Sequence, residues 1–138
     1  MKIKEVLNYN QAIKAVVDNA KDVNALVKFR LLGMAKQFEP IVANFDTVRE
    51  EKIAKYGTTN ESGQTGIFAP EKDKFDDDKK YDEAVNEFEE TVKKFTNDID
   101  EVLDSEADIE IKKFKYTDIM DSGLPSDYLI AIYDLIEE

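Results

Sequence analysis

Acidic side chains are the residues of this sequence whose number and spacing could carry chemistry. Asp76, Asp77 and Asp78 stand next to one another. Further along the chain follows a looser run of carboxylates, made of Asp98, Asp100, Glu101, Asp104, Glu106 and Asp108. Paired carboxylates can transfer protons, and sets of their oxygens bind hard cations such as Ca²⁺. Both clusters are therefore candidates for acid-base or metal chemistry.

Neither cluster has the arrangement that this chemistry needs. A calcium-binding loop requires a glycine in the middle of its oxygen ligands and a glutamate at its end, and the second run contains no glycine. Three aspartates at the start of a helix complement the positive end of the helix dipole. We therefore interpret both clusters as solvated helix ends, and we predict neither a metal nor another cofactor.

The sequence contains no histidine and no cysteine. Their absence excludes serine-histidine triads, cysteine nucleophiles and zinc sites that use these ligands. The remaining candidate for ligand chemistry is a glycine-containing stretch, KYGTTNESGQTGIFAPEKDKF, at 55–75. It lacks the spacing of a phosphate-binding loop or of a dinucleotide fingerprint, and no apolar strand precedes it. We interpret it as a turn and predict a non-enzymatic protein.

Two apolar stripes with a regular spacing of four and three residues predict the main helices. The first stripe is Val27, Leu31, Met34, Phe38, Ile41, Phe45 and Val48. The second stripe is Tyr81, Val85, Phe88, Val92, Phe95, Ile99 and Val102. Such heptad spacing is typical of helices that pack along their length. Seven positions on each side predict an antiparallel, coiled-coil-like hairpin of two long helices.

The hairpin helices are expected at about 22–56 and 73–105, with a tip loop at 57–72. Asp22 is the candidate N-cap of the first helix, and Gly57 is its candidate stop. Pro40 lies inside that helix and predicts a kink or a break near 36–38, because proline removes a backbone hydrogen bond. The 138 residues suit one domain, at 1–138.

Smaller elements are expected at both ends of the chain, so that the fold class is mainly α. Tyr9–Asn19 predicts a short N-terminal helix. Alternating residues in Lys2–Val6 and Asp108–Tyr116 predict a small two-stranded ribbon of the termini. A C-terminal helix is expected after Pro125, with one inward face made of Leu129, Ile132, Tyr133 and Ile136.

The net charge of −12 limits the partners that the protein can have. Residues 1–60 carry 10 basic and 7 acidic side chains, whereas residues 61–138 carry 9 and 24. Nucleic acid repels such a molecule, so we predict no direct nucleic-acid binding. An alternative is an acidic DNA-mimic inhibitor of a host DNA-binding or defence protein, because rows of carboxylates on a helix can imitate phosphates. Lysines at 79, 80, 93 and 94 interrupt that row.

Protein binding is the function that these features favour. Ile67 and Phe68 are apolar residues on the tip loop, which must fold back or meet a partner. The predicted partner-binding residues are Ile67, Phe68, Asp98, Asp100, Glu101 and Asp104. A second copy of the chain is a further candidate partner, because two helices cover only part of each other's apolar surface. No stretch is apolar over the roughly 20 residues that a membrane helix needs.

Four segments together resemble, in their layout, small tailed-phage proteins grouped as a domain of unknown function. These segments are MKIKE, REEKIAKYGTTNESG, IEIKKFKYTDI and LPSDYLIAIYDLIEE. The resemblance implies a phage-encoded accessory, structural or assembly factor that binds a host or phage protein. It also implies a location in the bacterial cytoplasm, which agrees with a first segment, Met1 to Leu7, too short and too charged for a signal peptide. It carries over no catalytic residue.

Overall fold

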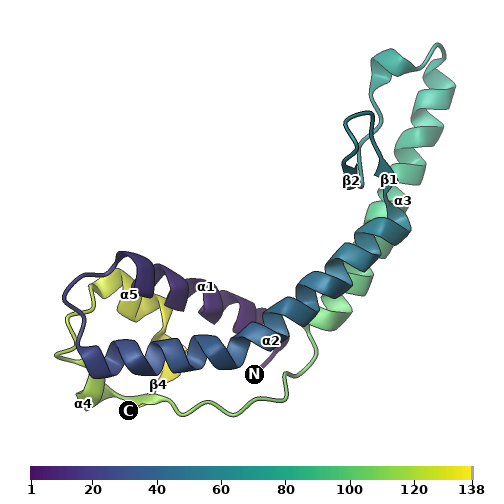
Figure 1. Ribbon diagram of the computed structural model, residues 1–138. Coiled ribbons are helices and arrows are strands. Elements are labelled where there is room, and N and C mark those ends of the chain that lie inside the picture. The colour runs from purple at the N-terminus through teal and green to yellow at the C-terminus, as the bar shows by residue number, and fades with distance from the viewer. Residues whose placement is uncertain (138) are drawn as a thin grey trace. The chain divides into compact units, whose positions relative to one another are not determined.

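The computed structural model describes residues 1–137, and their contacts form two compact units (Figure 1). The first, which we call the terminal unit, contains Met1–Ala43 and the chain from Asp104 onward. The second, which we call the middle unit, contains Asn44–Leu103. The protein is mainly helical, as the two apolar stripes predict. That all of it forms one domain stays a prediction.

The terminal unit contains all the buried hydrophobic side chains of the described chain. Its regular elements are α1 (Ile3–Asn19), the first part of α2 (Ala25–Tyr56), β3 (Phe114–Lys115), α4 (Tyr116–Ile119), α5 (Ser126–Ala131), the 3-10 helix η2 (Tyr133–Leu135) and β4 (Ile136–Glu137). The core consists of Val6, Tyr9, Ile13, Val16, Val27, Leu31, Met34, Phe38, Phe114, Ile119, Leu124, Ile132 and Leu135. Both ends of the chain therefore contribute to one core.

Helix α1 begins earlier than the sequence predicted. Val6 lies on the same buried face as Tyr9, Ile13 and Val16, so the helical spacing extends almost to the N-terminus. The backbone N–H of Lys2 donates to Glu5 Oε2 at 2.6 Å and so satisfies one donor at the helix start. The expectation of a strand over 2–6 is wrong, because burying Val6 with the helix face outweighs the short alternating pattern.

The predicted ribbon of the termini is replaced by two smaller pairings. Lys2 forms an isolated antiparallel bridge with Glu106, and the N–H of Ala107 donates to the carbonyl of Met1 at 2.8 Å. Strand β3 instead pairs in parallel with β4, with Phe114 opposite Ile136. The C-terminus therefore supplies the partner that the sequence assigned to residues 2–6.

Helix α2 begins one turn later than expected and ends where expected. Asn24, not Asp22, is the N-cap: its Oδ1 accepts hydrogen bonds from the N–H groups of Leu26 at 2.9 Å and Val27 at 3.4 Å. Asp22 has a left-handed backbone with φ 61°, so it lies in the turn before the cap. The stop at Tyr56 is confirmed, and the N–H of Gly57 donates to the carbonyl of Ile53. The helix continues unbroken through Pro40.

The apolar stripe of α2 does not pack against α3 along its whole length, as the seven-on-seven pairing predicted. Its first four positions, Val27 to Phe38, belong to the core formed with α1 and the C-terminal segments. Those elements bury this half almost completely, which a single facing helix cannot do. Only the later part of the stripe, which includes Phe45 and Val48, lies in the middle unit.

The middle unit contains the predicted antiparallel helical hairpin, made of the end of α2 and α3 (Asp78–Leu103) (Figure 1). Between the helices lie β1 (Thr58–Thr59), β2 (Thr65–Gly66) and the 3-10 helix η1 (Lys72–Lys74). Strands β1 and β2 pair antiparallel and close the predicted turn as a β-hairpin. Helix α3 begins five residues later than expected, where the side chain of Asp77 accepts the N–H of Lys79 at 2.9 Å.

No residue of the middle unit is fully buried. Along α3 the stripe positions are half-buried at most, and Val92 is 36% exposed. The helix pair therefore has an apolar interface, but it lacks a closed core.

Gly33 provides a prediction about α2. It lies inside the helix, and a Cβ added there meets no heavy atom within 4 Å. Because glycine costs about 0.5 to 1 kcal/mol relative to alanine in a helix, Gly33→Ala is expected to raise the free energy of unfolding by that amount in urea denaturation. The matched control is Gly57→Ala, whose Cβ would lie 2.5 Å from the carbonyl oxygens of Ile53 and Gly66 and should destabilise. Destabilisation by Gly33→Ala would contradict the open surroundings of this residue.

Candidate protein-binding surface

The two predicted apolar tip residues lie after β2, in the middle unit. Ile67 is half-buried and Phe68 is 45% exposed. Both line a hollow of about 220 Å³ that is also lined by Ala84 and Phe88 of α3. The two residues thus fold back toward α3, which covers much of their apolar surface. Binding of a partner by the rest of that surface stays a prediction.

Two of the four predicted acidic binding residues have partners within the chain. Asp98 Oδ2 accepts a hydrogen bond from the Tyr56 hydroxyl at 2.7 Å and contacts Lys52 Nζ at 3.3 Å. The hydrogen bond from Tyr56 is the main reason that the pKa of Asp98 is lowered. Asp104 lies in the terminal unit, where a hydrogen bond from Lys4 Nζ at 2.9 Å lowers the pKa of its carboxyl group.

Asp100 and Glu101 are exposed, and no ion pair involves either of them within residues 1–137. The acidic row needed for DNA mimicry thus loses Asp98 and Asp104 to cations of the same chain. DNA mimicry stays a prediction, and these two ion pairs count against it.

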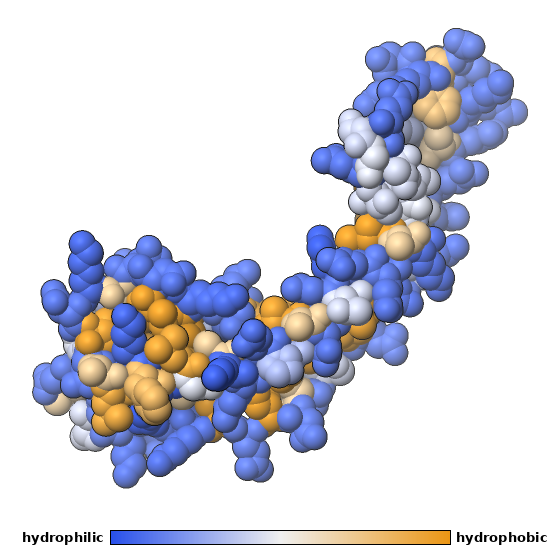
Figure 2. Space-filling model, viewed as in Figure 1, coloured by the Kyte–Doolittle hydropathy of each residue, from blue (hydrophilic) through white to orange (hydrophobic). Residues whose placement is uncertain are grey.

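A different surface, which is not among the binding residues predicted from the sequence, lies at the C-terminal segment. Four large apolar side chains of this segment are more than half exposed: Tyr116 at 58%, Met120 at 55%, Ile130 at 74% and Tyr133 at 68%. Figure 2 shows hydrophobic surface gathered on the terminal unit, around the position of α5 in Figure 1. Isolated exposed apolar residues are common, whereas a contiguous group of them is a candidate interaction surface.

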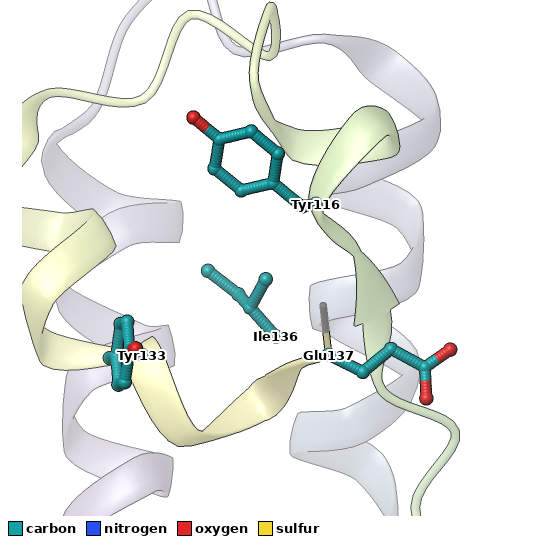
Figure 3. Close-up of a pocket in the computed structure, with 4 residues that line it drawn as sticks. All are labelled: Tyr116, Tyr133, Ile136 and Glu137. Carbon is teal, nitrogen blue, oxygen red and sulfur yellow. The ribbon is translucent and has the colours of Figure 1, made fainter.

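These side chains surround two adjoining cavities, which we call the C-terminal hollow. The larger has a volume of about 340 Å³ and is lined by Tyr116, Tyr133, Ile136 and Glu137 (Figure 3). The second, of about 200 Å³, shares Tyr116, Tyr133 and Ile136 and is also lined by Ile119, Met120, Leu129 and Ile130. The two tyrosine rings lie on opposite sides of Ile136 (Figure 3). The hollow is therefore an apolar depression whose bordering side chains are exposed to solvent.

Buried anchors hold the elements around the hollow in place. Ile119 of α4, Ile132 after α5 and Leu135 of η2 are all at most 1% exposed. The pairing of β3 with β4 brings residue 136 next to residue 114. Arg30 lies over the ring of Phe114, 4.2 Å from its centroid, and its Nη1 lies 3.6 Å from Asp118 Oδ2. The hollow is thus formed by a segment fixed on both sides of it.

The charge of the segment that forms the hollow has one sign. Residues 116–137 contain five acidic side chains and no lysine or arginine: Asp118, Asp121, Asp127, Asp134 and Glu137. Asp118 faces Arg30, and Asp134 accepts a hydrogen bond from Tyr9. Among residues 1–137, no ion pair involves Asp121, Asp127 or Glu137. Lys115 lies opposite Glu137 where β3 pairs with β4. Asp121 and Asp127, which form no ion pair within residues 1–137, and Glu137 beside Lys115 therefore belong to the same segment as the apolar hollow.

Tyr9 attaches α1 to this segment, and its environment gives a pH-dependent prediction. Its hydroxyl donates to Asp134 Oδ2 at 2.6 Å, and burial and this hydrogen bond together raise the pKa of Tyr9 well above its ordinary value of 10. In the unfolded chain the tyrosine ionises at about pH 10. The stabilisation is therefore complete below pH 10 and is lost progressively as the pH rises above it.

Tyr9→Phe is expected to lower the free energy of unfolding at pH 7 by about 1.5 to 3 kcal/mol, the range for a hydrogen bond to a charged group. Urea denaturation repeated between pH 7 and 11 should show the difference from the natural protein narrowing above pH 10. Tyr133→Phe is the control, because that side chain is exposed and should change little at any pH. A difference that stays constant up to pH 11 would contradict the role given to Tyr9.

The sequence contained a signal for the hollow, which lay in composition and not in periodicity. The stretch YLIAIYDLI at 128–136 is apolar at eight of nine positions. A short helix buries only one face, so some of these residues must remain uncovered. The single C-terminal helix expected here is instead α5 followed by η2 and β4. Leu129, Ile132 and Ile136 do pack inward, whereas the expectation for Tyr133 is wrong.

The described residues include neither a metal-binding cluster nor a membrane-spanning helix. Within 1–137, no group of three or more acidic side chains is arranged to hold a metal ion. None of the helices described is long and apolar enough to cross a membrane. In comparisons with known proteins, no family model, no curated protein and no solved structure matches this chain.

Proposed function

We propose that the protein is a non-enzymatic protein-binding module and that the C-terminal hollow is its docking surface. The observation that carries this proposal is the exposure of Tyr116, Met120, Ile130 and Tyr133 around one apolar depression. Water contacts these side chains at a cost of about 25 cal/mol for each Å² of apolar surface. A partner that covers them recovers this free energy, which is the main favourable contribution in protein association.

The depression has the features of a protein-binding site and lacks those of an active site. Its lining is apolar except for Glu137 and the two tyrosine hydroxyls. General acid-base catalysis needs a proton-exchanging group held in place beside the reacting atoms, whereas Tyr116 and Tyr133 are more than half exposed to solvent. The resemblance to phage proteins supports a host or phage protein as the partner, in the bacterial cytoplasm.

Site-specific photocrosslinking in cells that produce the protein tests this proposal. Benzoylphenylalanine at position 133 is expected to crosslink a protein, and this product should be lost when Ile130→Ser is added. The same probe at position 29 is the matched control, because Phe29 is 73% exposed on α2 and lies outside the hollow. Equal products from positions 29 and 133, or a product that Ile130→Ser leaves unchanged, would overturn the hollow as the docking surface.

A further inference from the structure

We infer that the segment that docks in the C-terminal hollow is basic, with large apolar anchors flanked by lysine or arginine. This inference rests on the proposed function and adds the chemistry of the partner. It follows from two observations that concern the same segment, residues 116–137. This segment forms an apolar depression, and it contains five carboxylates and no lysine or arginine. The other acidic region of the chain, on α3, carries lysines among its carboxylates, so its charge is compensated in part.

The apolar lining sets the size and character of the anchors. The range for ligand pockets begins at about 300 Å³. The larger cavity, of about 340 Å³, lies just above this limit, and the smaller, of about 200 Å³, lies below it. Two adjoining cavities of this size each accept a large side chain of an extended or helical segment. Anchors one helical turn apart are the usual way in which an amphipathic segment fills such a groove.

The carboxylates determine the charge around these anchors. Asp127 precedes Ile130 by three residues on α5, so both lie on one side of this helix. Asp121 directly follows Met120, and Glu137 itself lines the larger cavity. Cations of a docked segment would therefore meet Asp121 and Asp127, which form no ion pair within residues 1–137. At Glu137 they would compete with Lys115, its register partner in β3. Complementary charge at the rim favours such a segment and rejects an acidic one.

A second copy of the chain fits the hollow poorly. A symmetric contact brings the same surface of both copies together. That contact would place two segments with five carboxylates and no basic residue against each other. Like charges brought together at an interface are unfavourable. The same reasoning applies to nucleic acid, whose phosphates the carboxylates repel.

Binding of three matched peptides by the full-length protein, measured by fluorescence anisotropy, tests the inference. The first peptide is an amphipathic 16-residue helix with leucine and phenylalanine anchors and lysine flanks. In the second, glutamate replaces each lysine, and in the third, glutamine replaces each anchor. The first is expected to bind at least about tenfold more tightly than either of the others, with affinity falling as salt rises from 50 to 300 mM.

Two pairs of variants locate this binding. Asp121→Asn with Asp127→Asn and Glu137→Gln should weaken binding of the lysine peptide about tenfold, as expected for three ion pairs at a rim. Asp82→Asn with Glu83→Gln and Glu89→Gln removes the same charge from exposed positions on α3 and should change the affinity less than about twofold. Ile130→Ser with Tyr133→Ser should abolish binding, whereas Leu26→Ser with Phe29→Ser, equally exposed on α2, should not.

The outcomes separate this inference from the proposed function. If the glutamate peptide binds as tightly as the lysine peptide, and Ile130→Ser with Tyr133→Ser abolishes both, the basic partner is wrong while the docking surface stands. If no peptide binds in a way that depends on the hollow, the inference fails and the crosslinking experiment alone decides the proposed function. If sedimentation shows dimers that Ile130→Ser with Tyr133→Ser dissociates, a second copy fills the hollow and the inference is overturned.

Discussion

Replacing Phe38 by alanine is expected to lower the free energy of unfolding of the terminal unit by about 3 to 5 kcal/mol. The Phe38 side chain has no exposed surface and packs in the core shared by both ends of the chain. Its removal forfeits the transfer free energy of a phenyl ring and leaves a cavity that the surrounding side chains fill only in part. Urea denaturation followed by circular dichroism measures this loss.

The control for Phe38→Ala is Phe29→Ala in the same helix. Phe29 is 73% exposed, so its removal should change the free energy of unfolding by no more than about 0.5 kcal/mol. The two variants delete the same atoms from one helix, and helix propensity favours both alike. Equal losses would contradict the assignment of one side of α2 to the core and the other to solvent.

Gly123→Ala is expected to destabilise the terminal unit by about 3 kcal/mol or more, because two unfavourable effects combine there. The backbone at Gly123 is left-handed, with φ +83°, and a Cβ would overlap the carbonyl oxygen of Asp22. The neighbouring carbonyl of Ser122 accepts the N–H of Asn24 at 2.6 Å, so this loop holds the start of α2. Relief of the overlap would pull the loop away from the N-cap of that helix.

Gly63→Ala separates the two effects. Gly63 is also left-handed, with φ +80°, but a Cβ there meets no heavy atom within 4 Å. This variant should lose only the cost of placing alanine in the left-handed region, about 1 to 2 kcal/mol. Hydrogen exchange resolved by segment measures both variants, each in its own unit. A loss at Gly123 no larger than the loss at Gly63 would show that the loop moves away from Asp22 without cost.

The long helices could be predicted from the sequence because their signals are local. A stripe that repeats every three or four residues depends on the helix alone. Which element packs against a stripe, in contrast, depends on the rest of the chain. The spacing from Val27 to Phe38 indicates that this face is covered, but it does not indicate that α1 and the C-terminal segments cover it in place of a second long helix. A strand pair of two residues, such as β3 with β4, has no pattern long enough to detect.

The position of the C-terminal hollow could not be predicted from the sequence for a related reason. Ile132 and Tyr133 are neighbours in an apolar stretch, yet one is buried and the other is 68% exposed. The difference depends on where the chain turns after Ala131, at the end of α5. Hydrophobicity alone predicts that most of this stretch is covered. It does not predict which side remains open, because that depends on distant residues such as Tyr9 and Phe114.

The terminal unit is built from two stretches that are separated in the chain by the sixty residues from Asn44 to Leu103. Joining them costs loop-closure entropy, which grows with the logarithm of the intervening length. The helical hairpin in that interval joins its own two ends, so once it forms, the effective loop is short. We therefore expect the hairpin to speed folding of the terminal unit even though it buries no residue fully. The middle of the chain would then lower the entropic cost of bringing the two ends together.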